Sequence, residues 1–188
     1  ALTSIGVYGI VLAGWASNSK YTLIGGLRSS AQLISYELAL GLSAVSIILM
    51  SGSLRLNDIV ADQQGYLLSW YVFKQPLAFL IFLIATYAET NRLPFDLTEA
   101  EQELVGGYHT EYSSMKFAMF FMSEYANMIT AAALTVTLFF GGWDVPLLDE
   151  KSLGIWGAML SVASFILKMG FFLFLFIWIR WKIGRTHV

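Results

Sequence analysis

Long apolar runs are the feature that most constrains the fold of this 188-residue chain. Segments 38–50, 77–87, 129–140 and 170–179 hold almost no polar side chain, and each extends into a segment long enough to cross a bilayer. Only 13% of the residues are charged, which is about half the share in a soluble domain. The sequence therefore predicts an all-α, polytopic membrane helix bundle that forms a single domain over residues 1–188.

Five spanning helices are predicted, separated by connections rich in Gly, Ser, Asn, Asp and Gln. Lys and Arg gather in the first and third connections and at the C-terminal end, which places these parts on the cytoplasmic or matrix side. Within the connections the glycine pairs 25–26 and 141–142 are interpreted as simple turns, and Trp70 as a residue of the membrane-interface belt. The predicted spans are 1–16, 27–50, 66–88, 115–140 and 153–179.

Composition excludes several classes of function. The net charge of −2 argues against a nucleic-acid partner, and the absence of cysteine excludes disulfides, thiolate zinc sites and cysteine-held iron–sulfur clusters in this chain. No catalytic residue or metal site is predicted, so any electron chemistry would belong to a partner. Because the chain opens inside an apolar run, we expect no signal peptide and expect further helices before residue 1.

An acidic connection, residues 89–114, holds six of the thirteen acidic residues. Overlapping capping boxes at 96–101 and the glycine pair 106–107 predict a short helix over about 97–105. Glu101 falls within the apolar arc of that helix, so its carboxyl group is expected to be the most desolvated. The alternative is a solvated acidic loop that only contacts other subunits.

Three ionisable residues lie inside predicted spans: Glu37, Glu124 and Lys168. Such a group costs about 2.5–3.5 kcal/mol at mid-membrane on insertion scales, so it is a functional candidate. Each shares its helix face with small or polar residues; Lys168, for example, is in line with Gly157 and Ser164. The pattern indicates a proton path, and the alternative is a structural Glu–Lys pair that sets the helix register.

One stretch of the chain is recognisable. The segment AETNRLPFDLTEAEQELV at 88–105, followed by GGYHTEY, resembles the signature of the membrane subunit that forms the quinone chamber of respiratory complex I (NADH:quinone oxidoreductase subunit 1). FAMFFMSEYAN at 117–127 continues it. The likeness extends upstream through GWASN at 14–18 and RSSAQLISYE at 28–37, and downstream through FGGW at 140–143 and residues 168–180. It covers nearly the whole chain.

The resemblance implies a fold of eight transmembrane helices, of which this chain would hold the third to seventh. It also implies the bacterial inner membrane as the location, with the mitochondrial inner membrane as the alternative. The quinone-chamber and coupling residues would be Glu89, Arg92, Asp96, Glu99, Glu101 and Glu103, and the proton path would contain Glu37, Glu124 and Lys168.

The resemblance further implies that this chain binds no cofactor of its own. Quinone would be the substrate, and the iron–sulfur clusters and FMN would lie on partner subunits. The expected partners are the peripheral-arm iron–sulfur and quinone-site subunits, the adjacent small membrane subunits, the antiporter-like subunits and the lipid bilayer.

Two departures from the family pattern are present. The chain ends in GRTHV, where a proline–arginine pattern usually follows the last of these spans, and Ser114 stands where glycine is more usual. Two other functions stay open. One is the proton-conducting anchor of a related ferredoxin-fed or hydrogenase-type complex, and the other is a purely structural scaffold.

Overall fold

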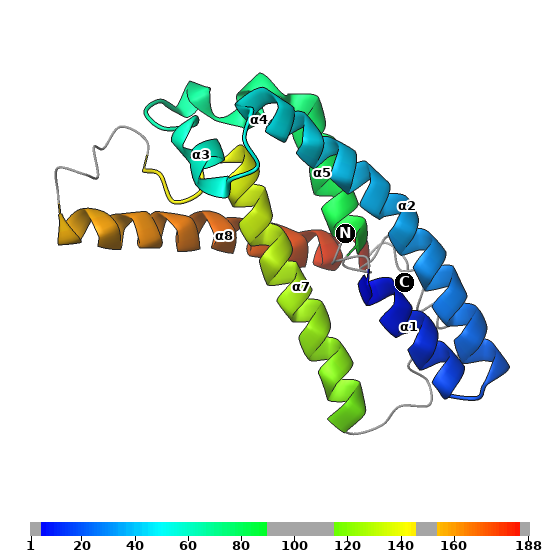
Figure 1. Ribbon diagram of the computed structural model, residues 1–188. Helices are drawn as coiled ribbons and strands as arrows, with labels where there is room; N and C mark the ends of the chain where they lie inside the picture. The colour runs from blue at the N-terminus through cyan, green and yellow to red at the C-terminus, as the bar shows by residue number, and fades with distance from the viewer. Residues whose placement is uncertain (1–4, 90–114, 146–153, 185–188) are drawn as a thin grey trace. The chain divides into compact units, whose positions relative to one another are not determined.

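The computed structural model describes residues 5–89, 115–145 and 154–184 (Figure 1). Every secondary-structure element in these ranges is helical, so the predicted all-α class is confirmed for this part of the chain. The predicted short helix over 97–105 lies outside the described residues, as do Arg92, Asp96, Glu99, Glu101 and Glu103.

The helices follow one another in the order predicted from the apolar segments. Among the described residues, two helices are long and apolar enough to cross a membrane. They are the second helix and the last helix over residues 155–179. That all five predicted segments cross a bilayer remains a prediction. The elements are α1 (Ile5–Ala16), α2 (Lys20–Ser51), α3 (Leu56–Ala61), the 3₁₀ helix η1 (Leu67–Ser69), α4 (Tyr71–Lys74), α5 (Pro76–Glu89), α7 (Met115–Phe139) and α8 (Ile155–Gly184).

The predicted connection over 17–26 is wrong, because α2 already begins at Lys20. A Cβ atom on Gly14 would come within 2.7 Å of the backbone oxygen of Thr22, and one on Gly26 would come within 3.2 Å of the backbone oxygen of Ile10. Glycine therefore permits α1 and the start of α2 to pack closely. Gly26 therefore serves helix packing, and the glycine pair at 25–26 lies within α2 and does not form a turn.

The predicted span over 66–88 is also wrong at its start, because the apolar helix begins at Pro76. Proline suits the first turn of a helix, since it lacks an N–H group, and it disfavours helical geometry in the residue before it. Gln75 accordingly has φ −135° and ψ 67°. Residues 55–75 instead form the short elements α3, η1 and α4, which separate α2 from α5.

Two compact units divide the chain. The first comprises Ala1–Ala39, Ala85–Asn127 and Arg180–Val188, and the second comprises Leu40–Ile84 and Met128–Ile179. The core of the second unit contains Ile47, Ile59, Tyr71, Phe82, Leu138 and Phe139. Aromatic rings pack edge to face around this core, with the Phe79 and Phe139 centroids 5.3 Å apart.

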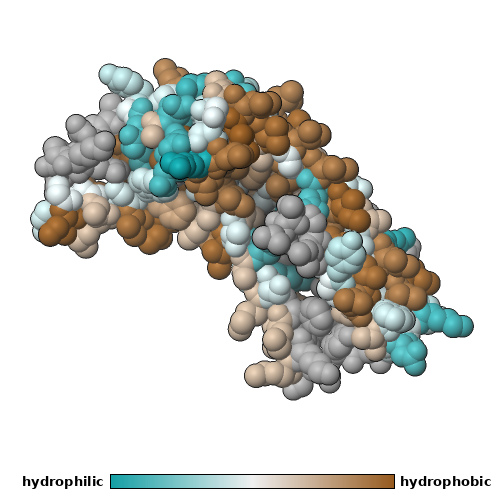
Figure 2. All heavy atoms as spheres, viewed as in Figure 1, coloured by the Kyte–Doolittle hydropathy of each residue, from teal (hydrophilic) through white to brown (hydrophobic). Residues whose placement is uncertain are grey.

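Large apolar side chains cover much of the surface visible in Figure 2. Leu49 on α2 is 77% exposed and Leu167 on α8 is 75% exposed, and many others on these helices are similar. Soluble monomers rarely expose large contiguous apolar patches. This surface is therefore typical of helices that face lipid or neighbouring membrane helices.

Candidate functional site

In the first unit, two carboxyl groups from different helices influence one another. Glu37 lies on α2, Glu89 is the last residue of α5, and both side chains are half-buried. They interact electrostatically as like charges. Glu124 on α7 belongs to the same unit and is also half-buried. Glu89 is the one predicted quinone-chamber residue that the structure describes.

In the second unit, the ammonium group of Lys168 on α8 meets the segment that follows α7. Its Nζ atom donates hydrogen bonds to the backbone oxygens of Phe140 at 3.0 Å, Gly142 at 3.1 Å and Asp144 at 2.7 Å. Ser164, one turn earlier on α8, reaches the same Asp144 oxygen at 3.5 Å. The predicted shared face is confirmed for Lys168 and Ser164, and the structure adds the backbone that this face binds.

Gln63 lies in the segment between α3 and α4, and its side chain binds the same end of α7. Its side chain is fully buried. Nε2 donates to the backbone oxygens of Ile59 at 3.1 Å and Leu138 at 3.2 Å, while Oε1 accepts from the backbone N–H groups of Tyr71 at 3.2 Å and Gly141 at 3.1 Å. One amide group thus joins three separate parts of the second unit.

The aromatic ring of Trp70 packs against the Lys168 ammonium group. The Lys168 ammonium lies 4.8 Å from the centroid of the Trp70 ring, which is the range of a cation–π interaction. The same ring packs edge to face on Phe140, with the centroids 5.6 Å apart. The interpretation of Trp70 as an interface-belt residue therefore misses its contacts inside the protein.

The next residue, Tyr71, is the first residue of α4, in the part of the sequence between the apolar helices α2 and α5. Its hydroxyl group donates a hydrogen bond to Oδ2 of Asp62 at 3.0 Å. Burial, the hydrogen bond to Asp62 and the charge of that carboxylate together raise the pKa of Tyr71 to about 12. Tyr71 therefore stays neutral at physiological pH and acts here as a hydrogen-bond donor.

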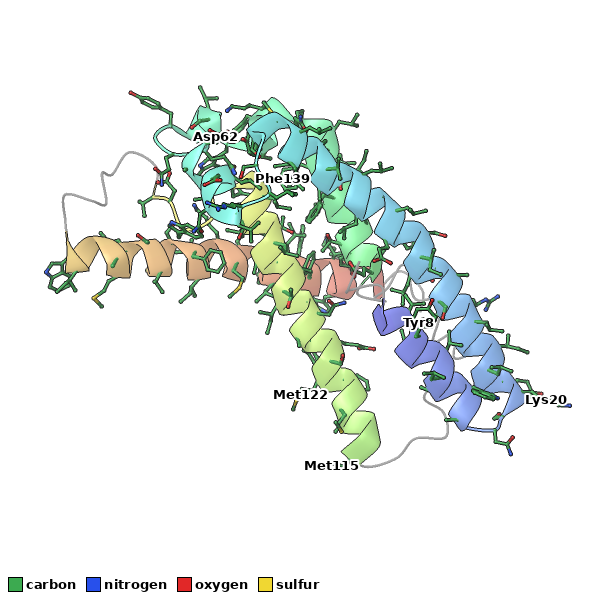
Figure 3. The ribbon with its side chains drawn as sticks, in the orientation of Figure 1. Tyr8, Lys20, Asp62, Met115, Met122 and Phe139 are labelled. Carbon is green, nitrogen blue, oxygen red and sulfur yellow. The ribbon has the colours of Figure 1, made fainter. Side chains whose placement is uncertain are left out.

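Sequence reasoning found Lys168 and missed Gln63. A lysine in an apolar segment is conspicuous, but a glutamine in a polar connection is not. Figure 3 labels Phe139 at the end of α7 and Asp62, the chain neighbour of Gln63. The hydrogen bond between Gln63 and Leu138 joins residues that are 75 positions apart, and no local signal could have indicated it.

Among the described residues, no group of three or more acidic, histidine or cysteine side chains could hold a metal ion.

Half-buried ionisable groups on long apolar helices with exposed faces are typical of one class of protein. This class is the helical membrane proteins that hold charged residues inside the protein. A family model described as NADH dehydrogenase matches residues 1–188. The chain belongs to this family, and the resemblance seen in the sequence is confirmed.

Curated relatives agree with this assignment, and all three described here are named as subunits of NADH-quinone oxidoreductase. Subunit 8 of the Rhodothermus marinus enzyme is 57% identical, over 98% of this chain and 57% of the relative. The relative from Geobacter sulfurreducens is 61% identical, over 96% of this chain and 48% of the relative. The relative from Salinibacter ruber is 52% identical, over 98% of this chain and 56% of the relative. The chain thus spans about half the length of the curated relatives it matches.

Proposed function

We propose that this chain is part of the membrane subunit through which a proton-translocating NADH:quinone oxidoreductase couples quinone reduction to proton movement. Membership of the NADH dehydrogenase family and the names of the relatives support this proposal. The chain would act inside a multi-subunit complex in a bacterial inner membrane. Iron–sulfur clusters and FMN would lie on partner subunits, in keeping with the absence of cysteine from this chain.

Burial and, after it, the charge of Glu37 raise the pKa of Glu89, and this supports the mechanism. The protonation of a half-buried carboxyl group in such a setting responds to a further change in charge nearby. A change in the charge of bound quinone would therefore alter the protonation of Glu89.

The quinone end of this mechanism would be the acidic connection. Glu89 is its first residue, and the remaining residues proposed to line the chamber and the coupling loop are Arg92, Asp96, Glu99, Glu101 and Glu103. The connection joins α5 to α7, so it links the helix that carries Glu89 with the helix that carries Glu124. The membrane end would be the proposed path of buried charged groups at Glu37, Glu124 and Lys168.

Neutralising Glu37 or Glu124 tests this function. The Glu37→Gln and Glu124→Gln variants of the full-length subunit are compared with the parent complex in native membrane vesicles. Because an amide cannot exchange a proton as a carboxyl group does, we expect each variant to lower NADH-driven proton translocation by about tenfold or more. Translocation is followed with a pH-sensitive dye, together with inhibitor-sensitive NADH:quinone reductase activity.

A matched control is Asp58→Asn, because Asp58 is an exposed acid on α3. This variant should translocate protons at the parent rate, and the amount of assembled complex is compared across all samples. Full translocation by both glutamine variants would contradict the proposal. Parent vesicles that respond to reduced ferredoxin and not to NADH would favour the related ferredoxin-fed complex.

A further inference from the structure

The Lys168 ammonium group has its hydrogen-bonding capacity filled by backbone oxygens. An ammonium group has three N–H donors, and Nζ makes three bonds, to the oxygens of Phe140, Gly142 and Asp144. The shortest of them, 2.7 Å to Asp144, has the length of a charge-assisted hydrogen bond. A neutral amine has only two N–H donors, so this set of acceptors fits the charged form.

One of these oxygens, that of Phe140, lies at the C-terminal end of α7, and those of Gly142 and Asp144 lie in the segment that follows it. The last four carbonyl groups of a helix lack partners within it and carry partial negative charge. After Phe139 the chain turns through Gly141 and Gly142, whose φ angles are +67° and +55°. The N–H group of Gly142 donates to the oxygen of Val136 at 3.0 Å, an oxygen that also accepts from the N–H group of Phe140, so the turn folds back onto the end of the helix.

The aromatic surroundings of Nζ also favour a positive charge. The face of the Trp70 ring attracts a cation at the observed 4.8 Å. Loss of a proton from Lys168 would remove one hydrogen bond and the cation–π attraction together.

We propose that Lys168 is a permanently charged cap that positions the C-terminal end of α7, and that it does not itself carry a translocated proton. This rests on the proposed function, and it refines that function by assigning the moving protons to the carboxyl groups. Lys168 is then a positioning residue, and the charge on its side chain stays constant through turnover.

Arginine distinguishes a fixed charge from a proton carrier, because its guanidinium group donates several hydrogen bonds and does not lose its proton in proteins. We compare Lys168→Arg and Lys168→Met in the full-length subunit within its complex. The Lys168→Arg variant should keep the parent ratio of protons translocated per NADH oxidised. The Lys168→Met variant should lower the amount of assembled, active complex by about tenfold or more, because the end of α7 and the segment after it lose three charge-assisted hydrogen bonds.

An assembled Lys168→Arg complex that oxidises NADH without translocating protons would overturn the assignment of Lys168 as a permanently charged cap. So would a Lys168→Met complex that assembles and translocates protons like the parent. Absence of NADH-driven translocation from the parent itself would instead contradict the proposed function, so the two failures are distinguishable.

A second measurement covers the case in which neither variant assembles. The native complex is treated with acetic anhydride, which acetylates a lysine only through its neutral amine form, with and without NADH, and the modified lysines are mapped by mass spectrometry. The exposed Lys20 and Lys74 should be modified in both samples. Lys168 should stay unmodified in both, and modification that appears during turnover would overturn the proposal.

Discussion

Replacing Gln63 with leucine should destabilise the second unit by several kcal/mol. The side chain is fully buried and its amide group bonds to four backbone groups, those of Ile59, Leu138, Tyr71 and Gly141. Leucine has a similar volume but would leave these buried groups without those bonds, at a cost of about 1–3 kcal/mol for each unsatisfied group. Even if the surrounding structure relaxes and satisfies some of these groups, we expect the free energy of unfolding to fall by about 3 kcal/mol or more.

The measurement is the thermal unfolding midpoint of the complex that carries the full-length subunit, together with its amount in the membrane. A loss of this size corresponds to a decrease of about 6 °C or more in Tm for a chain of this length. The matched control is Gln64→Leu, at the neighbouring exposed glutamine, which should leave Tm nearly unchanged. Equal Tm values for the two variants would show that Gln63 does not hold the end of α7.

The second large effect is expected for Gly142→Ala. A Cβ atom at this position would lie 2.9 Å from Cγ2 of the buried Val60, and the residue has φ +55°. A non-glycine residue in this left-handed conformation costs about 1–2 kcal/mol, and the contact with Val60 adds to it. We expect a total loss of about 2–3 kcal/mol or more.

Two comparisons separate the contact from the backbone strain in the same thermal assay. Gly52 has a similar φ, +67°, with nothing within 4 Å of an added Cβ atom, so Gly52→Ala should show the strain alone. The double variant Gly142→Ala with Val60→Ala should lose less stability than the sum of its single variants, because the smaller side chain makes room. Strict additivity, or equal losses for Gly52→Ala and Gly142→Ala, would contradict a steric role for Val60.

The sequence was sufficient wherever a property depends on neighbouring residues. Apolar runs predict the helices because a helix satisfies its own backbone hydrogen bonds without a partner segment. Glu37, Glu124 and Lys168 stand out for the same local reason, since a charge in an apolar run is costly wherever the helix packs. The family resemblance likewise depends on contiguous motifs.

Boundaries and turns were predicted less well, because they depend on packing between helices. The local sequence predicts a turn at the glycines 25–26, yet they lie within α2, where Gly26 approaches α1. The span over 66–88 begins only at Pro76. In both places the local sequence permits more than one conformation, and contacts with another segment select one of them.

The sequence alone determined the helical class, the apolar segments, the unusual charges and the family. Only the tertiary structure showed what Lys168 binds and that Gln63 matters at all. Backbone carbonyl and N–H groups are the same in every residue, so no pattern of side chains indicates which of them lacks a partner at the end of a helix. The three-dimensional path of α7 and of its glycine turn decides where those groups lie, and therefore which distant side chains can bind them.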